Sequence, residues 1–333
     1  MIKAHAALEA GGLLVPFEYD PGTLNPNEVQ LEVLHCGLCH SDLSMIDNAW
    51  GFSQYPLVPG HEVIGKISRL GSQVRHLQEG DTVGLGWHAG YCMTCRTCLG
   101  GDHNLCASAQ GTIVGRHGGF AEQVRAHSAS VVKLPDSIDP TTAGPLFCGG
   151  ITVFNPLVQF DIRVNSQVAI IGIGGLGHLA IQFLNAWGCE VTAFTSSADK
   201  AKEAIALGAH HTLNTHNEAQ LEAASSRFDL IISTVNVHLN WNAYLNTLAP
   251  KGRLHLVGAT LEPINLSAFG LIGQQRSVSG SPVGSPAVIA EMLEFATRHR
   301  IQPIIEQFRF DQANEAINRL RHGTPKFRVV LSR

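Results

Sequence analysis

From about Val168 onward, the chain alternates short apolar runs with helical patterns. The run "QVAIIGI" precedes "GHLAIQFLNAWG", "EVTAFTS" precedes "DKAKEAIALGA", and "FDLIISTV" precedes "LNWNAYLNTLA". Strand and helix patterns in this alternation predict a parallel sheet that helices cover on both faces. The alternation stops near Pro282–Pro286. We therefore expect a doubly wound α/β domain over residues 151–285.

The first strand–helix junction of this segment carries a glycine motif. Gly172, Gly174 and Gly177 form G-x-G-x-x-G between an apolar run and a helical pattern. Glycines at this spacing allow a tight turn, a close backbone approach to a pyrophosphate and close packing of helix on strand. We expect the loop, with Gly175 and Leu176, to bind a dinucleotide at the helix N-terminus. A glycine-rich turn without a ligand is the alternative, and the βα units that follow disfavour it.

The end of the second predicted strand indicates which dinucleotide binds. Domains that bind NAD usually carry Asp or Glu there, on the ribose hydroxyls. Here Thr195, Ser196 and Ser197 stand at that position and Lys200 follows. Hydroxyls and an ammonium suit the 2′-phosphate of NADP(H), whereas a carboxylate would repel it. We interpret Asp199 as an acid in the first turn of the next helix; a solvated helix lysine is the alternative for Lys200.

The first 150 residues have a different character. They are rich in Gly and Pro and contain short apolar runs such as "EVQLEVL", "EVIGKISRL" and "DTVGLGW". Alternating apolar and polar residues between frequent turns predict an irregular β-rich domain. A helical pattern at 287–300 and the strand-like run "KFRVVLS" follow the α/β segment. We assign residues 1–150 and 286–333 to one domain, into which residues 151–285 are inserted.

Composition and charge exclude several classes of protein. Charged residues make up 15% of the chain, hydrophobic residues 44%, and the net charge is −4. No run of Lys and Arg suggests a nucleic-acid surface. No apolar stretch approaches the roughly 18 residues of a membrane span, and the N-terminus lacks the apolar core of a signal peptide. We expect a cytoplasmic protein, in which clustered cysteines more often bind metal than form disulfides.

One such cluster is local in the sequence. Cys92, Cys95, Cys98 and Cys106 have the pattern C-x2-C-x2-C-x7-C. Four thiolates can complete a tetrahedral shell around Zn²⁺ and leave no open position, so this site would be structural. An iron–sulfur cluster is the weaker alternative, because nothing else in the sequence suggests electron transfer.

A second candidate set is dispersed along the chain. Cys39, His61 and Cys148 could meet only through the fold, and three protein ligands with one open position are typical of catalytic zinc. The spacing alone does not establish this set. Taken singly, Cys148 in "PLFCGGITVF" could be a buried small hydrophobe, and His61 a core histidine with its hydrogen bonds satisfied.

The order of the motifs resembles that of a known family. "CGLCHSD", "GHEVIG", the four-cysteine segment, "FCGGITVF" and "GIGGLGHLAIQF" resemble zinc-containing medium-chain alcohol dehydrogenases, especially the cinnamyl-alcohol-dehydrogenase branch and its bacterial broad-range NADPH-dependent aldehyde reductases. The resemblance covers essentially the whole chain. It implies a GroES-like catalytic domain, a Rossmann domain, two zinc ions per chain and a homodimer.

The resemblance also implies roles for single residues. It makes Cys39, His61 and Cys148 the ligands of a catalytic zinc. It implies that Asp42 orients a ligand from behind and that Glu62 can approach the metal, with a structural ion pair as the alternative for Glu62.

Two further residues of the same motif receive roles in this way. Ser41 matches the hydroxyl that hydrogen-bonds the substrate oxygen, and His40 matches a residue near the cofactor pyrophosphate. One departure concerns the proton relay. Many relatives carry a histidine where this chain has Ser44, so the exit route of the proton is open.

We therefore expect a zinc-dependent enzyme that reversibly reduces aldehydes, aromatic and medium-chain aliphatic, to primary alcohols with NADPH. The alternatives are an NAD-dependent zinc dehydrogenase of polyols or secondary alcohols and a non-catalytic dinucleotide-binding sensor. Apolar and aromatic residues at the matching positions are candidates for the substrate pocket, with plain core as the alternative for each: Met45, Trp50, Phe52, Trp87, Pro282 and Val283.

Overall fold

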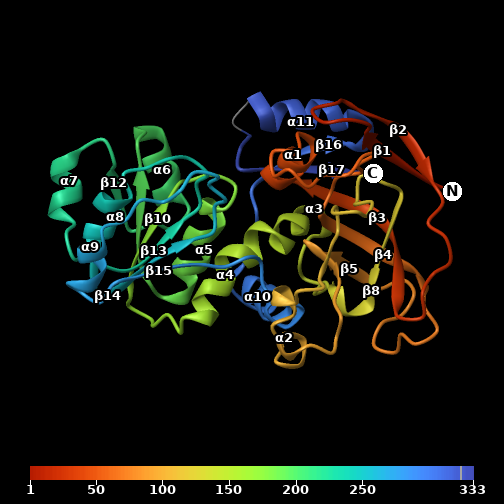
Figure 1. Ribbon diagram of the computed structural model, residues 1–333, viewed down its shortest axis with the longest axis horizontal. Helices are drawn as coiled ribbons and strands as arrows, with labels where there is room; N and C mark the ends of the chain where they lie inside the picture. The colour runs from red at the N-terminus through yellow and green to blue at the C-terminus, as the bar shows by residue number, and fades with distance from the viewer. Residues whose placement is uncertain (323–324) are drawn as a thin grey trace. The chain divides into compact units, whose positions relative to one another are not determined.

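The computed structural model describes residues 1–322 and 325–333. The chain divides into two compact units. The first comprises Met1–Ile151 and Val283–Arg333, and the second comprises Thr152–Pro282. Figure 1 traces this path, with both ends of the chain in the first unit and the middle of the chain in the second.

The first unit is built around a largely antiparallel sheet. Its strand order is β16-β17-β3-β4-β5-β9, and β8 also pairs with β3. A β1–β2 hairpin and the short β6–β7 pair complete the strands that the structure describes in this unit. The strands are β1 (Ile2–Ala7), β2 (Leu14–Tyr19), β3 (Glu28–Leu38), β4 (Glu62–Leu70), β5 (Thr82–Leu85), β6 (His88–Gly90), β7 (Gln110–Gly111), β8 (Gln123–His127), β9 (Val131–Lys133), β16 (Ile305–Arg309) and β17 (Arg328–Ser332).

Short helices connect these strands, and longer ones follow at the C-terminal end. The α-helices are α1 (His40–Ile46), α2 (Arg96–Leu99), α3 (Pro140–Ala143), α10 (Pro286–His299) and α11 (Ala313–His322). The 3₁₀ helices among the described residues lie at His103–Leu105, Ser128–Ser130, Gly144–Phe147 and Phe310–Gln312. The helix α4 (Gly149–Gln159) carries the chain from the first unit into the second.

The central strand β3 explains why this unit holds together. It pairs with β17, β4 and β8, and its side chains Val29, Leu31 and Val33 are fully buried. These residues join one continuous apolar core with the inner faces of the neighbouring strands. The core keeps the end of β3 and the start of β4 fixed against each other.

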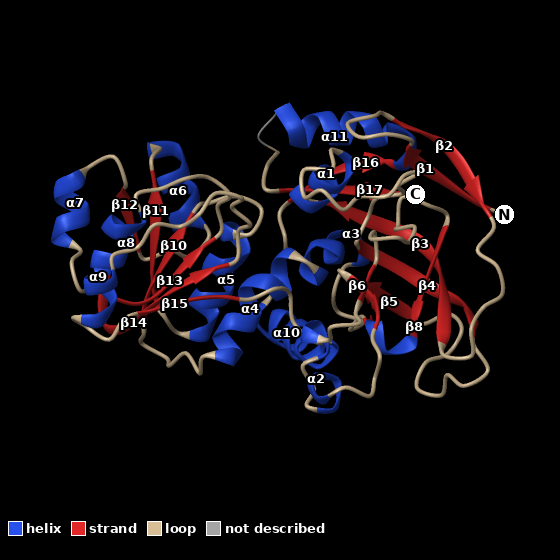
Figure 2. Cartoon of the chain, in the orientation of Figure 1, coloured by secondary structure: helices blue, strands red, loops and turns tan. Residues whose placement is uncertain are grey.

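The second unit is a six-stranded sheet in which all pairings are parallel. Its order, β12-β11-β10-β13-β14-β15, is the 3-2-1-4-5-6 order of a Rossmann fold. Figure 2 shows helices on both sides of these strands. The strands are β10 (Gln167–Ile171), β11 (Glu190–Thr195), β12 (His211–Asn214), β13 (Phe228–Ser233), β14 (Leu248–Leu256) and β15 (Ser277–Gly280). The helices are α5 (Gly177–Trp187), α6 (Ala198–Ala206), α7 (Glu218–Ala223), α8 (Trp241–Thr247) and α9 (Ala268–Ile272).

The α/β class that the sequence predicts is therefore confirmed, with a β-rich unit and a doubly wound parallel unit. In the part of the chain that the structure describes, no helix has both the length and the apolar character that crossing a membrane requires.

Candidate functional site

The strand register of the first unit brings Cys39 and His61 together. It pairs Gly37, near the end of β3, with Glu62, the first residue of β4. Cys39 directly follows β3 and His61 directly precedes β4, so the two residues lie at the same end of the strand pair. Cys39 is also the N-cap of α1, and its Sγ accepts a hydrogen bond from the backbone N–H of Ser41 at 3.3 Å.

Cys148 reaches the same place by close packing. It follows the 3₁₀ helix Gly144–Phe147, which contacts β3 and β4. A Cβ on Gly144 would lie 2.7 Å from the carbonyl oxygen of Glu62, a distance that real Cβ atoms do not adopt. The absent side chain at Gly144 thus lets the backbone approach β4 and deliver Cys148.

The three side chains converge on one point. His61 Nε2 lies 3.3 Å from Cys39 Sγ and 3.3 Å from Cys148 Sγ, and the two sulfur atoms are 4.0 Å apart. A tetrahedral shell with Zn–S near 2.3 Å and Zn–N near 2.0 Å has edges of about 3.5–3.8 Å. The donor set and the spacing fit a zinc ion, with Glu62 as a fourth acidic group within reach.

Asp42 orients the histidine from behind. Its Oδ1 accepts the N–H of Gly60 at 2.9 Å and lies 3.0 Å from His61 Nδ1, while its Oδ2 accepts the N–H of Cys39 at 3.0 Å. Asp42 and His61 are fully buried. A carboxylate on Nδ1 selects the tautomer in which Nε2 carries a lone pair toward the two sulfurs, as a metal ligand requires.

Sequence reasoning missed Arg328, which lies on β17 near the C-terminal end. Its guanidinium pairs with Glu62 Oε1 in a buried ion pair. Burial raises the pKa of Glu62, while Arg328 opposes that rise. Glu62 Oε2 is buried and has no hydrogen-bond partner among the residues that the structure describes. This orphaned oxygen, next to His61, fits a carboxylate beside a cation site.

The side chains of the cluster also shift one another's pKa values. Burial disfavours a charged His61, but the Asp42 carboxylate and the Cys39 thiolate outweigh it and raise the pKa of His61. The hydrogen bond from Cys148 and the imidazole of His61 lower the pKa of Cys39, whereas the pKa of Cys148 is raised. The pair of thiols already stabilises one thiolate, and a divalent cation would favour both.

The local cysteine cluster also forms in the first unit. Cys92, Cys95, Cys98 and Cys106 place their sulfur atoms within 4.8 Å of one another. Cys92 Sγ lies 3.9 Å from Cys98 Sγ and 3.5 Å from Cys106 Sγ. Hydrogen bonds to Cys92 from backbone N–H groups lower its pKa to about 6. Four converging thiols with these separations fit a closed tetrahedral zinc shell.

Aromatic residues lie beside the Cys39–His61–Cys148 cluster. The centroid of the Trp87 ring lies 5.1 Å from that of the His61 ring and 5.9 Å from that of the Trp50 ring. Trp50 stacks on Phe52 with 5.8 Å between the ring centroids. The structure thus brings together three of the predicted pocket residues. Met45, in contrast, is fully buried in the apolar core.

The remaining predicted residues of the first unit lie on α1 and at the return of the chain. Ser41 and Ser44 are partly exposed and three residues apart on α1, so they share a face of that helix. His40, at the start of α1, is exposed. Val283 is partly buried and belongs to the first unit, whereas Pro282 is exposed and belongs to the second.

In the second unit the glycine loop lies at the switch point of the sheet, between β10 and β13. Gly172 has φ +90°, and a Cβ on Gly177 would lie 1.9 Å from the carbonyl oxygen of Gly172, so both positions require glycine. A Cβ on Gly174 would meet no described atom within 4 Å. Its bare backbone therefore borders open space, as a site for a pyrophosphate would. Gly175 and Leu176 lie in the same loop, and Leu176 is the N-cap of α5.

A second residue that the sequence did not reveal closes this switch point. Thr234, directly after β13, donates its hydroxyl to the carbonyl oxygens of Ile171 and Gly172 at 3.0 and 2.9 Å. It ties the start of the glycine loop to the neighbouring strand.

The end of β11 carries the predicted hydroxyls. Ser197 is the N-cap of α6, its N–H donates to Thr195 Oγ1 at 3.2 Å, and its Oγ accepts the N–H of Lys200. The Lys200 ammonium donates to the carbonyl oxygen of Ile173 in the glycine loop at 2.9 Å. Lys200 therefore contacts the glycine loop and is not a purely solvated lysine. Ser196 is exposed on the same turn.

Asp199 points elsewhere. It lies in the first turn of α6, where its exposed carboxylate pairs with Lys202 at 3.9 Å.

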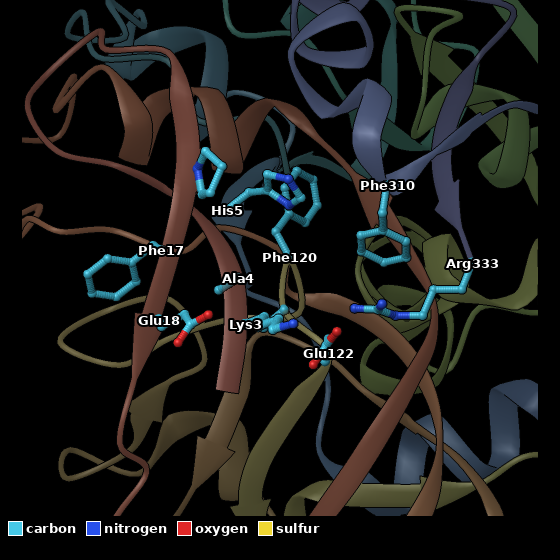
Figure 3. A pocket seen from close by; sticks show the side chains of 11 residues that line it. Lys3, Ala4, His5, Phe17, Glu18, Phe120, Glu122, Phe310 and Arg333 are labelled. Carbon is cyan, nitrogen blue, oxygen red and sulfur yellow. The ribbon is translucent and has the colours of Figure 1, made fainter. Parts of the chain in front are cut away.

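A cavity of about 420 Å³ lies apart from both cysteine clusters. Figure 3 shows its lining from β1, β2, the segment around Phe120 and the C-terminal residues, with Phe310 and Arg333 at one side. None of its lining residues belongs to either metal-ligating group. Size alone does not identify a functional site, and the groups that could hold a metal ion lie elsewhere.

Comparisons with known proteins agree with this architecture. Residues 25–136 match the alcohol dehydrogenase GroES-like domain, and residues 175–298 match the zinc-binding dehydrogenase domain. The chain is 63% identical over 332 residues to aldehyde reductase AdhA of Synechocystis sp., an alignment that covers 100% of this chain and 99% of the relative. It is 37% identical to a probable cinnamyl alcohol dehydrogenase of Arabidopsis thaliana, over 98% of this chain and 92% of that protein.

Solved structures show the same fold. A cinnamyl alcohol dehydrogenase from Sorghum bicolor superposes with a TM-score of 0.95 at 36% identity, covering 99% of this chain and 97% of that chain. One from Helicobacter pylori, complexed with NADP(H), superposes with a TM-score of 0.90 at 28% identity, covering 99% and 97%.

A GroES-like unit with a Cys/His/Glu cluster, joined to a Rossmann unit, defines a two-domain zinc-dependent dehydrogenase. The chain belongs to the zinc-containing medium-chain alcohol dehydrogenase family, and its relatives include cinnamyl alcohol dehydrogenases and an aldehyde reductase.

Proposed function

We propose that this protein reduces aldehydes to primary alcohols with NADPH, reversibly, at a zinc ion held by Cys39, His61 and Cys148. The observation that carries the proposal is the convergence of these three side chains on one point, backed by Asp42. The name of the Synechocystis relative, an aldehyde reductase, agrees with this direction of reaction. A sensor that only bound a dinucleotide would not need this buried cluster.

When bound, Zn²⁺ supplies a Lewis acid that polarises a carbonyl group, and NADPH supplies the hydride. The residues of this chain arrange the surroundings. Asp42 holds the His61 ring in place, and the Ser41 hydroxyl is the group that gives a proton to the substrate oxygen. Ser44 lies three residues further along α1, and in this proposal its hydroxyl returns a proton to Ser41 after Ser41 has given its own to the substrate oxygen. Glu62 and Arg328 form a neutral pair that keeps a carboxylate beside the metal site.

The aromatic residues beside His61 favour apolar substrates. Trp87, Trp50 and Phe52 form a connected group of rings whose Trp87 member contacts His61. Such a wall suits aromatic and medium-chain aliphatic aldehydes, because burying their apolar surface stabilises binding by about 25 cal/mol per Å². Polyols would bury hydroxyl groups against these rings without hydrogen-bond partners, which is unfavourable.

The preference for NADPH rests on the end of β11. Thr195 and Ser197 offer hydroxyls there, Lys200 offers an ammonium, and Asp199 turns away to Lys202. Similarity to a structure complexed with NADP(H) agrees with this proposal. An NAD-dependent polyol dehydrogenase is the competing function, and a carboxylate at this turn would favour it.

Initial rates with NADPH and NADH on an aldehyde panel test the proposal, using zinc-replete enzyme. We expect NADPH to be preferred, and Lys200→Ala to raise the KM for NADPH about tenfold more than the KM for NADH. Both cofactors lose the contact of Lys200 with the glycine loop, and only NADPH also loses a charged hydrogen bond to its 2′-phosphate. The variant Lys202→Ala, on the same helix, is the control. A clear preference of the wild-type enzyme for NADH would refute the NADPH assignment.

We also propose that the protein is a homodimer, and two surface features support this. β15 is an edge strand of the six-stranded sheet, with one side unpaired in the described chain. On the nearby α9, Phe269 is 87% exposed and Ile272 71% exposed, and such apolar side chains commonly mark a protein interface. Light scattering on the wild-type protein and on Phe269→Asp tests this, and a monomeric wild-type protein would refute it.

A further inference from the structure

The four-cysteine cluster contacts the point where the chain returns to the first unit. Asn104, between Cys98 and Cys106, donates its side-chain amide to the carbonyl oxygen of Val283 at 3.0 Å. The two residues are 179 positions apart, and Val283 is the first residue of the returning segment. A segment whose only role was to bind its own metal ion would not need this hydrogen bond to Val283.

The segment that carries Asn104 is well fixed. The N–H of Leu99 donates to the carbonyl oxygen of Cys95 at 2.9 Å, and the N–H of Asp102 donates to that of Thr97 at 2.8 Å. The 3₁₀ helix His103–Leu105 follows, and the N–H of Cys106 donates to the carbonyl oxygen of His103 at 3.0 Å. Asn104 therefore extends from a segment that backbone hydrogen bonds fix between the cysteines of the cluster.

Val283 leads directly into α10. Ser285 is buried and is the N-cap of this helix, and its carbonyl oxygen accepts the N–H of Ile289 at 2.9 Å. Pro286 occupies the first turn, where its fixed φ favours the helix start. The path of the chain at Val283 thus sets where α10 begins.

The buried face of α10 contacts the segment that holds Cys148. Met292 is fully buried, and its Sδ would lie 3.1 Å from a Cβ placed on Gly150. Gly150 is two residues after Cys148, at the start of α4. The glycine lets α10 and the start of α4 pack closely, so a shift of α10 would move Cys148 relative to His61.

We propose that Asn104 is a positioning residue that couples the four-cysteine cluster to the ligand Cys148 through Val283 and α10. The cluster is then more than a local brace, because it holds one wall of the neighbouring metal site at the correct distance. This inference rests on the proposed assignment of Cys39, His61 and Cys148 as ligands of the catalytic zinc. It identifies Asn104 as a residue that influences that site without touching substrate or cofactor.

Two measurements on the full-length holoenzyme test the coupling in Asn104→Asp and Asn104→Ala. The aspartate is nearly isosteric but cannot donate the hydrogen bond. The time course of zinc release to a chelator is recorded. The kinetic phase of zinc release from the Cys39–His61–Cys148 site is the one that is absent in Cys148→Ser. We expect that phase to be about fivefold faster in both variants, as for loss of one neutral hydrogen bond, with the phase of the four-cysteine cluster unchanged.

Hydrogen exchange of the amides in α10 is the second measurement, and it does not depend on metal at Cys148. We expect faster exchange over residues 286–293 with unchanged exchange in β3, and partial recovery in Asn104→Gln, which keeps an amide donor. The control is Leu105→Ala, whose side chain is 53% exposed on the same 3₁₀ helix.

Three outcomes would overturn the coupling. In the Asn104 variants, hydrogen exchange in α10 could match that of the wild type, or it could increase equally in α10 and β3. Leu105→Ala could also increase exchange in α10 as much as the Asn104 variants do. Absence of a Cys148-dependent zinc phase in the wild-type protein would instead refute the proposed metal site, and α10 exchange would still decide the role of Asn104.

Discussion

At the scale of single residues, Asp42 connects three parts of the proposed metal site. Its two carboxylate oxygens accept from the N–H groups of Cys39 and Gly60 and face His61 Nδ1. One buried carboxylate thereby fixes the cap of α1, the turn before β4 and the orientation of the imidazole. Partners of this kind are commonly as important for metal affinity as the ligands themselves.

Asp42→Asn is expected to weaken zinc binding at the Cys39–His61–Cys148 site by about 10–100-fold. Asparagine has only one acceptor oxygen. Its amide N–H group would face one of the three N–H groups of Cys39, Gly60 and His61 that now face the carboxylate. Competition with a chromophoric chelator measures the affinity. Asp199→Asn, an exposed carboxylate of the second unit, is the control, and wild-type affinity in Asp42→Asn would contradict the role given to Asp42.

At the scale of elements, some glycines in the turn between β10 and α5 are required by packing, and another leaves room for a ligand. Gly172 and Gly177 face protein atoms, since a Cβ on Gly177 would meet the carbonyl oxygen of Gly172. Gly174 faces open space. Three glycines of one motif therefore serve two different purposes.

This difference predicts opposite results for two alanine substitutions. Gly177→Ala should destabilise the second unit by more than 1 kcal/mol, because backbone must shift to remove the overlap. Gly174→Ala should leave the melting temperature nearly unchanged and weaken NADPH binding, because the new methyl group occupies the approach to the backbone. Calorimetry and fluorescence titration measure the two effects, and equal loss of stability in both variants would contradict this interpretation.

Several elements of the fold were not predictable from local patterns. The strands β12 and β15 have four residues each and lie at the two edges of the parallel sheet. In β12 three of the four residues are exposed. Edge strands have little apolar content because they are covered on fewer sides, so they lack the continuous apolar run that revealed β10, β11 and β13.

At the scale of the whole molecule, both proposed metal sites lie in the first unit and the proposed cofactor loop in the second. In the proposed assignment the two clusters differ in the shell they give a metal. The four cysteines of the local cluster would fill a tetrahedral shell, whereas Cys39, His61 and Cys148 would leave one position open, since Glu62, although within reach, is paired with Arg328.

Metal analysis of the purified protein should find about two zinc ions per chain, since two ligand sets are present. Cys148→Ser should retain about one zinc and lose aldehyde reduction, while Cys106→Ser should lower the melting temperature. Retention of two zinc ions in Cys148→Ser would contradict the dispersed site.

Two histidines predict how the stability of the folded chain depends on pH. Burial lowers the pKa of His88 in the first unit to about 4, and burial together with Arg253 lowers that of His255 in the second unit to about 4. Each remains neutral in the fold, whereas the unfolded chain binds a proton below its ordinary pKa near 6.5. Their contribution is fully present above about pH 6.5 and is lost as the pH falls toward 4.

Thermal melts between pH 4 and pH 7 test this for His255, whose ring nitrogens lie 2.9 Å from the hydroxyls of Ser279 and Ser281. We expect His255→Asn to be less stable at pH 7 and to show a smaller loss of stability on acidification. His216→Asn, at an exposed position, is the control. An unchanged slope in His255→Asn would contradict the assignment.

The sequence by itself determined the features that depend on neighbours along the chain. The glycine loop and the four-cysteine cluster each occupy a few consecutive residues, so their spacing already specifies a turn or a ligand set. The alternation of apolar strands and amphipathic helices specified the parallel sheet for the same reason, because hydrophobic periodicity is a local property. The residues proposed to select the dinucleotide also follow one strand directly.

Only the tertiary structure decided which distant residues meet. Cys39 and His61 come together through the pairing of β3 with β4, and Cys148 joins them because Gly144 has no side chain. The ion pair of Glu62 with Arg328 spans 266 positions, and the contact of Asn104 with Val283 spans 179. No local pattern encodes such pairs, because they form only when packing of the whole core fixes the distance between segments that are otherwise independent.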